Sequence, residues 1–301
     1  MSNTNEMKQS GAIPINKVRR YLNKKLFRNK LPARIGALGF DWSTGFDIRN
    51  QIGQLTIKNQ GDNFSCGGQA GAGFIEVQRR RQGITEGSIS AKSIYAPISY
   101  KGGGTTIPAL IKQLATVGAN LEALVPSNDA YGNALPEYLM EETSWVSAVT
   151  TADAFTRAGY TPYDVPIGAN VMDTVATVIS QWGAVIFEIV GQNGNQPSWV
   201  SDMPSIPSKL NANPLWYHFM YAIGAKFING KKYIIAVQSE GPTWGDNGIQ
   251  YISEDYFTSG YVKDIFTLIY DTHIAPLPTN TSWYAMMLLF FRSLFKVEAP
   301  A

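Results

Sequence analysis

Nucleophilic chemistry in this chain of 301 residues can rest on its one cysteine, Cys66, and on either of two histidines, His218 and His273. A thiol reacts as its thiolate, and a helix N-terminus or a nearby imidazolium lowers its pKa because both favour negative charge. Cys66 stands where the sequence predicts that a helix begins, and the base must then be a histidine. His218 opens a β-rich segment, whereas His273 lies beside a proline-rich linker and is interpreted as structural.

The first half of the chain is predicted to be mainly helical. A tight loop after Gln60 leads into a helix whose glycines at 67, 68, 71 and 73 each weaken it by about 1 kcal/mol relative to alanine, so tertiary packing must hold it. A second helix follows the glycines at 102–104, with Thr105 or Thr106 as its cap and Gly118 at its end. A third is expected over 171–182.

The second half is predicted to be mainly antiparallel strand. Residues 184–190, 218–227, 231–237 and 249–252 are rich in branched and aromatic side chains, and Asn229-Gly230 is a hairpin signal. A helical part followed by a strand-rich part predicts an α+β fold of two lobes that share a cleft, because alternating βαβ units are absent.

Several sequence blocks resemble the papain-like (cathepsin-type) cysteine proteases. The family motif NQGxCGSCWAF has a glutamine six residues before the nucleophile, and Asn59-Gln60-Gly61 and Cys66 take these places. The resemblance implies that the Gln60 amide and the Cys66 backbone N–H form an oxyanion hole. His218 follows Cys66 by 152 residues, close to the separation typical of this family. The resemblance implies that Cys66 attacks the substrate carbonyl as the nucleophile and that His218 is the base.

Three further blocks extend the resemblance over roughly residues 38–260. Phe40-Asp41-Trp42 is similar to the start of the mature domain, and residues 230–248 are similar to the motif GxxYWIVKNSWGxxWGxxG. The glycines at 102–104, followed by a helix, resemble the loop that lines the substrate cleft. The resemblance implies that Gly103 or Gly104 pairs its backbone with an extended polypeptide substrate. Tyr217, directly before His218, is the third substrate-binding candidate.

The departures from the family pattern fall close to the expected site. Gln238 replaces the asparagine that orients the histidine, with the same amide one methylene further out. Glu240 replaces the tryptophan that shields this contact, Gly67 replaces the tryptophan after the nucleophile, and Asn63 occupies a position that commonly forms a disulfide. These changes leave two interpretations open, an active endopeptidase or a catalytically impaired binding protein with the same fold.

Composition and cysteine content limit the class of protein. Hydrophobic residues make up 45% and charged residues 16%, which is typical of a globular chain. One cysteine cannot form an internal disulfide, and the first thirty residues contain no standard signal peptide, so an intracellular or otherwise reducing compartment is expected. There is no metal-ligand spacing and no nucleotide-binding fingerprint, so no cofactor is predicted.

Both ends of the chain lie outside the predicted peptidase domain at 35–262, with its helical lobe at about 35–160 and its β lobe at about 161–262. Residues 1–34 carry nine Lys/Arg against Glu6, a net charge of +8, on a pattern that suits an amphipathic helix. This extension is interpreted as a solvated helix, a membrane-surface segment or a short propeptide or clamp, and nucleic acid is not an expected partner.

The C-terminal extension, 263–301, contains an apolar segment at 283–297 that is shorter than the ~20 residues a spanning helix needs. It is interpreted as a docked helix or partner-binding segment, or as an anchor to a membrane surface. The remaining functional alternative is therefore a membrane- or particle-associated structural component, with association with a virion as one form of it.

Overall fold

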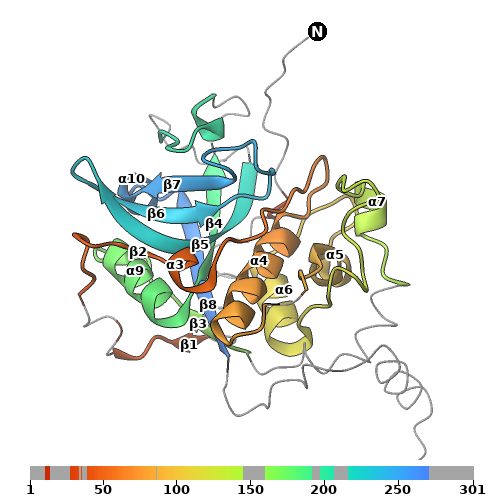
Figure 1. The fold of residues 1–301 in the computed structure, drawn as a ribbon, viewed down its shortest axis with the longest axis horizontal. Helices are drawn as coiled ribbons and strands as arrows, with labels where there is room; N and C mark the ends of the chain where they lie inside the picture. Colours follow the sequence, from red (N-terminus) through yellow and green to blue (C-terminus); the bar gives the residue numbers. More distant parts are fainter. Residues whose placement is uncertain are drawn as a thin grey trace, which may run out of the picture.

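The fold is known from a computed structural model that describes residues 11–13, 28–33, 35, 39–85, 87–144, 160–191, 197–206 and 216–270. It is an α+β arrangement in which helices from the first half of the chain lie beside a largely antiparallel sheet (Figure 1). The two parts meet along the face of the sheet that α4 covers, and this contact positions the candidate site.

The sheet has the strand order β1-β3-β8-β4-β5-β6-β7, and β2 pairs with β5. Among the described strands, β1 and β3 pair in parallel and the other neighbours pair antiparallel. The bounds are β1 Asn29–Lys30, β2 Phe46–Asp47, β3 Tyr160–Asp164, β4 Val185–Gly191, β5 Trp216–Ile228, β6 Lys231–Val237, β7 Ile249–Ser253 and β8 Val262–Tyr270. The β5–β6 hairpin turns at Asn229 and Gly230, whose φ values of 49° and 82° are those the Asn-Gly signal predicts.

Helices of the first half gather on one side of the sheet (Figure 1). They are α3 Arg49–Ile52, α4 Cys66–Arg81, α5 Ala91–Tyr95, α6 Ile107–Lys112 and α7 Glu137–Met140. A π-helical segment, Gln113–Val117, continues α6 until Gly118. Two more helices, α9 Val171–Trp182 and α10 Glu254–Thr258, pack on the strands of the second half. The described residues also include short 3-10 turns at Ala96–Ile98 and Pro197–Val200.

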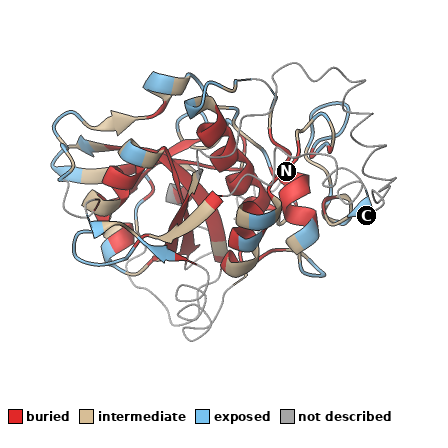
Figure 2. Cartoon of the chain, turned by 90° about the horizontal axis from the view of Figure 1, so that it is seen from below, coloured by how far each residue is buried: buried red, intermediate tan, exposed pale blue. Residues whose placement is uncertain are grey.

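Alternation along β5 separates two hydrophobic cores. Phe219, Tyr221 and Ile223 face the core shared with α4, α5 and α6, whereas Met220 and Ala222 face the core shared with α9 and α10. Successive side chains of a strand point to opposite faces, so one strand serves both cores. Burial is continuous from the sheet into the adjacent helices (Figure 2).

The predicted α+β fold is confirmed, and the helix expected at 171–182 and the four expected strands are present. The domain limits differ from the sheet that forms. Strand β8 begins at Val262, the predicted end of the domain, and lies between β3 and β4, while β1 adds residues from the N-terminal extension. The rest of that extension, apart from 11–13 and a few residues before 35, and the apolar segment 283–297 lie outside the described residues.

Within the described ranges, no helix combines the length and the apolar character that crossing a membrane requires.

Candidate active site

Cys66 is the first residue of α4, so its thiol lies at the positive end of the helix dipole. The thiol is free and fully buried. Backbone N–H groups of Phe219, Gly11 and Gly67 donate hydrogen bonds to it. Phe219 follows His218 in β5, so the strand that carries the candidate base passes directly beside the candidate nucleophile.

His218 belongs to a chain of buried side-chain amides. Its Nε2 lies 2.7 Å from Gln238 Oε1, and Gln238 Nε2 donates to Gln250 Oε1 at 2.7 Å. Gln250 Nε2 in turn donates to the carbonyl oxygens of Ser201, at 2.9 Å, and Trp199. Because its NH₂ group is engaged by Gln250, Gln238 presents its oxygen to the ring, and Nε2 must carry the imidazole proton. Nδ1, which has no hydrogen-bond partner within the described chain, is left as the basic nitrogen.

Gln60 ties the loop before Cys66 to the loop after β6. Its Nε2 donates to Asn63 O at 3.0 Å, and its Oε1 accepts from Ser239 Oγ at 2.6 Å. Its backbone N–H also donates to Ser239 O at 2.6 Å. The amide is therefore fixed in orientation, and one of its two N–H groups remains for a developing oxyanion.

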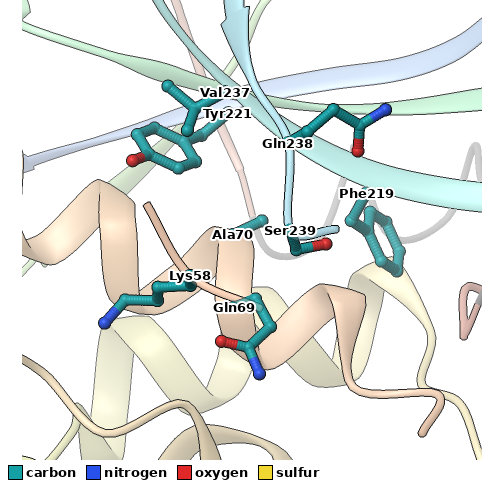
Figure 3. A pocket seen from close by; sticks show the side chains of 8 residues that line it. All are labelled: Lys58, Gln69, Ala70, Phe219, Tyr221, Val237, Gln238 and Ser239. Atoms are coloured by element: carbon teal, nitrogen blue, oxygen red, sulfur yellow. The ribbon is translucent and has the colours of Figure 1, made fainter. Parts of the chain in front are cut away.

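A narrow pocket lies between α4 and strands β5 and β6 (Figure 3). Gln238 and Ser239 line it opposite Gln69 of α4. It has no room for a water molecule. The side of the amide chain that faces α4 is therefore packed rather than solvated.

The two glycines that are expected to pair with a substrate make hydrogen bonds within their own loop. Gly103 N–H donates to Tyr100 O at 2.8 Å, and Tyr100 N–H donates to Gly104 O at 3.0 Å, so both glycines close their own turn. Their φ values of 100° and 87° favour glycine. The backbone that pairs across the cleft is that of Thr105, which sequence reasoning treated only as a helix cap.

Residues 11–13 occupy the space between the two lobes as an extended segment. Thr105 N–H donates to Gly11 O and Ile13 N–H donates to Thr105 O, both at 2.7 Å. Ala12 N–H donates to Tyr217 O at 3.3 Å. The segment therefore bridges the glycine loop and β5, and the backbone of Gly11 contacts the thiol of Cys66. Tyr217 borders the cleft through its backbone oxygen.

Burial sets the protonation states of the candidate pair. Burial, together with the charge of Glu240, raises the pKa of the Cys66 thiol to about 12, and the backbone hydrogen bonds oppose this rise. Burial lowers the pKa of His218 to about 4, although its hydrogen bond with Gln238 opposes this. At pH 7 both groups are neutral in this arrangement. Access of water to the cleft is therefore needed before a thiolate–imidazolium pair can form.

Sequence reasoning named Cys66, His218, Gln60 and Gln238. The structure joins the side chains of His218 and Gln238, ties Gln60 to Ser239, the residue after Gln238, and places the backbone N–H of Phe219, the residue after His218, against the Cys66 thiol. Sequence reasoning missed Gln250 and Thr105. Gln250 is a polar residue of a short strand, and its neighbours in the sequence do not distinguish it. Thr105 directly follows the glycine run, and this position was the available signal for its role.

Known structures with this architecture were found across most of the chain. They include procathepsin B from Trypanosoma congolense, which is 12% identical with a TM-score of 0.61. The match covers 89% of this chain and 88% of that one. Xylellain, a cysteine protease from Xylella fastidiosa, is 16% identical with a TM-score of 0.63, and the match covers 90% of this chain and 99% of that one. At these identities the likeness shows the papain-like fold.

Bromelain from Ananas comosus, solved with an inhibitor, is 20% identical with a TM-score of 0.53, and the match covers 75% of this chain and 99% of that one. No model of a known protein family matches the sequence, and no curated protein matches it.

Proposed function

We propose that the protein is a papain-like cysteine endopeptidase that hydrolyses peptide bonds through a thioester on Cys66. The observation that carries the proposal is the contact of 2.7 Å between His218 Nε2 and Gln238 Oε1, on the strand that passes beside Cys66 at the start of α4. An amide that fixes the imidazole with Nδ1 unprotonated is what a Cys–His pair requires. The substitution of asparagine by glutamine therefore keeps the orienting contact.

The reaction follows from these positions. The Cys66 thiolate attacks the scissile carbonyl carbon, and the resulting oxyanion accepts hydrogen bonds from the Cys66 backbone N–H and the Gln60 amide. As the C–N bond breaks, protonated His218 gives its Nδ1 proton to the leaving amine, and an acyl thioester remains. His218 then takes a proton from water, which attacks the thioester carbonyl and releases the carboxylic acid and the Cys66 thiolate.

We also propose that residues 11–13 hold the full chain in a latent state, the role of propeptide or clamp considered for the N-terminal extension. Their backbone takes both Thr105 hydrogen bonds that an extended substrate could use. Gly11 also lies against the thiol, whose burial is the main cause of its raised pKa, although the Gly11 N–H itself lowers this pKa. With a pKa of about 12, only on the order of 10⁻⁵ of Cys66 is thiolate at pH 7.

The test uses Gly11→Ala in the full chain. A Cβ at Gly11 would lie 1.4 Å from Phe64 O, so alanine expels the segment without shortening the protein. Gly39→Ala is the matched control, because nothing lies within 4 Å of a Cβ there. The reaction of Cys66 with an irreversible thiol-directed peptidase inhibitor is followed by intact mass at pH 7, together with hydrolysis of an unstructured peptide.

We expect Gly11→Ala to react at least tenfold faster than the wild type and Gly39→Ala to match the wild type, because loss of burial lowers the thiol pKa. Both activities should vanish in Cys66→Ala. If Gly11→Ala binds the inhibitor but cleaves no peptide, the protein is the impaired binding form. If no variant reacts, the peptidase proposal is wrong. If the wild type already reacts as fast as Gly11→Ala, the latency proposal alone is wrong.

A further inference from the structure

The loop that leads to Cys66 and the glycine loop at 102–104, whose neighbour Thr105 pairs with residues 11–13, are joined by side-chain hydrogen bonds. No covalent link joins them. With one cysteine in the chain, no disulfide can hold them together. Asn63, at the position that resembles a disulfide site, uses its Nδ2 to donate to Leu135 O at 2.7 Å and its Oδ1 to accept from Ser65 N–H at 3.0 Å. The segment that starts α7 therefore serves as the support for the Cys66 loop.

The direct connection between the two loops runs through Tyr95 and Glu137. Gly104 N–H donates to Tyr95 Oη at 2.6 Å, and Tyr95 Oη donates to Glu137 Oε1 at 2.5 Å. The second oxygen of the same carboxylate, Oε2, accepts from Phe64 N–H at 2.6 Å. The Tyr95 hydroxyl and the Glu137 carboxylate thus connect Gly104 to Phe64. Gly104 directly precedes Thr105, and Phe64 lies two residues before Cys66. We call this hydrogen-bonded connection the span.

Burial and steric contact make this span rigid. Tyr95 is fully buried, and burial and the neighbouring Glu137 raise the pKa of its hydroxyl, so it stays protonated and keeps donating. The Phe64 ring lies over Gly103, where a Cβ would be 2.2 Å from Phe64 Cδ2. The two loops therefore touch, and a small rotation of either one would break a buried hydrogen bond.

We propose that Tyr95 and Glu137 are positioning residues that set the register between the substrate-pairing backbone at Thr105 and the nucleophile Cys66. This inference rests on the proposed peptidase function. It predicts that weakening the span affects binding of an extended peptide more than the reactivity of the thiol. A small alkylating reagent does not need the Thr105 backbone, so it reports on the thiol alone.

The decisive variant is Tyr95→Phe, which removes only the hydroxyl. Its matched control is Tyr256→Phe, because Tyr256 is equally buried and its Oη donates to Ser205 O at 2.8 Å, on the far core of the sheet. Amide hydrogen exchange is measured in the full chain, where no catalytic activity is needed. We expect exchange at Gly104 to rise at least fivefold in Tyr95→Phe and to stay at the wild-type rate in Tyr256→Phe.

Kinetics are measured for the same substitutions combined with Gly11→Ala. Loss of one hydrogen bond is expected to raise KM for an extended peptide about fivefold in Tyr95→Phe, with kcat and the rate of alkylation by iodoacetamide unchanged. Glu137→Gln keeps an acceptor for Phe64 and should retain more activity than Glu137→Ala.

Wild-type exchange at Gly104 in Tyr95→Phe would overturn the inference, as would equal effects of both Tyr→Phe changes on KM. Unlabelled Cys66 in every variant would instead overturn the peptidase function, while the exchange result still decides the span.

Discussion

At the scale of single residues, the amide chain His218–Gln238–Gln250 decides which imidazole nitrogen can act as the base. The Gln238 amide could present either its oxygen or its NH₂ group to the imidazole ring. Its hydrogen bond to Gln250 selects the orientation with the oxygen toward the ring. Gln250 is itself held by the Trp199 and Ser201 carbonyls and is fully buried. The tautomer of His218 is thus set by a residue that does not touch it.

We predict that Gln250→Leu lets the Gln238 amide turn its NH₂ group toward His218, which moves the imidazole proton from Nε2 to Nδ1. NMR of the imidazole nitrogens in the full chain measures this tautomer directly. Buried carbonyls and an amide lose their partners, so unfolding free energy should also fall by about 1–3 kcal/mol. Gln78→Leu is the matched control, since Gln78 is buried and donates to Trp182 O at 2.7 Å, away from the site. An unchanged tautomer in Gln250→Leu would contradict the prediction.

At the scale of elements, α4 depends on close packing rather than on helix propensity. Glycine lowers the intrinsic stability of a helix interior by about 1 kcal/mol relative to alanine. A Cβ at Gly68 would nevertheless lie 2.6 Å from Ala91 O and 2.8 Å from Tyr95 Cβ, so the absence of a side chain lets α5 approach. This approach places Tyr95 within reach of Gly104.

We predict that Gly68→Ala destabilises the protein by about 1–3 kcal/mol, because a backbone oxygen and a Cβ cannot move aside and overpacking outweighs the gain in propensity. Gly71→Ala, three residues further along the same helix, is the control. Its Cβ would meet only side-chain atoms of Leu114 and Ile94 at 3.2 Å or more, so a smaller change is expected. Urea unfolding midpoints measure both. Equal midpoints for the two variants would show that the contact with α5 is not the limiting one.

At the scale of the whole molecule, part of the basic N-terminal extension belongs to the folded body. The Arg28 guanidinium is fully buried and contacts Asp264 at 2.6 and 3.0 Å and Asp164 at 3.1 Å. Asp164 belongs to β3, which pairs with β1, and Asp264 belongs to β8, which pairs with β3. Removal of the whole extension 1–34 would take away this cation, whereas a cut before Arg28 would keep it.

We predict that Arg28→Leu lowers the free energy of unfolding by about 3–5 kcal/mol, because it leaves buried carboxylates without their cation. Lys231→Leu is the control. The Lys231–Asp255 pair is largely solvent-exposed, and such pairs contribute about 0–1 kcal/mol. Chemical denaturation at pH 7 measures both variants. A loss of less than about 1 kcal/mol in Arg28→Leu would show that the extension is not needed for the stability of the sheet.

Local patterns in the sequence identified much of this protein. The helix that begins at Cys66, the Asn229-Gly230 hairpin and the helix closed by Gly183 are each encoded within a few neighbouring residues, and each has its expected structure. Strands β3 and β8 were missed. Nothing next to them in the chain indicates the partners that make them strands.

The sequence by itself determined the fold class and the identities of the candidate nucleophile, base and orienting amide. Only the tertiary structure decided that Gln250 fixes the amide, that Thr105 pairs across the cleft, and that Tyr95 and Glu137 join the two loops. It also placed Gly11 against Cys66 and buried the thiol, which raises the pKa of the thiol. The physical reason is that these properties depend on burial and on hydrogen-bond partners far apart in the chain, which local spacing does not specify.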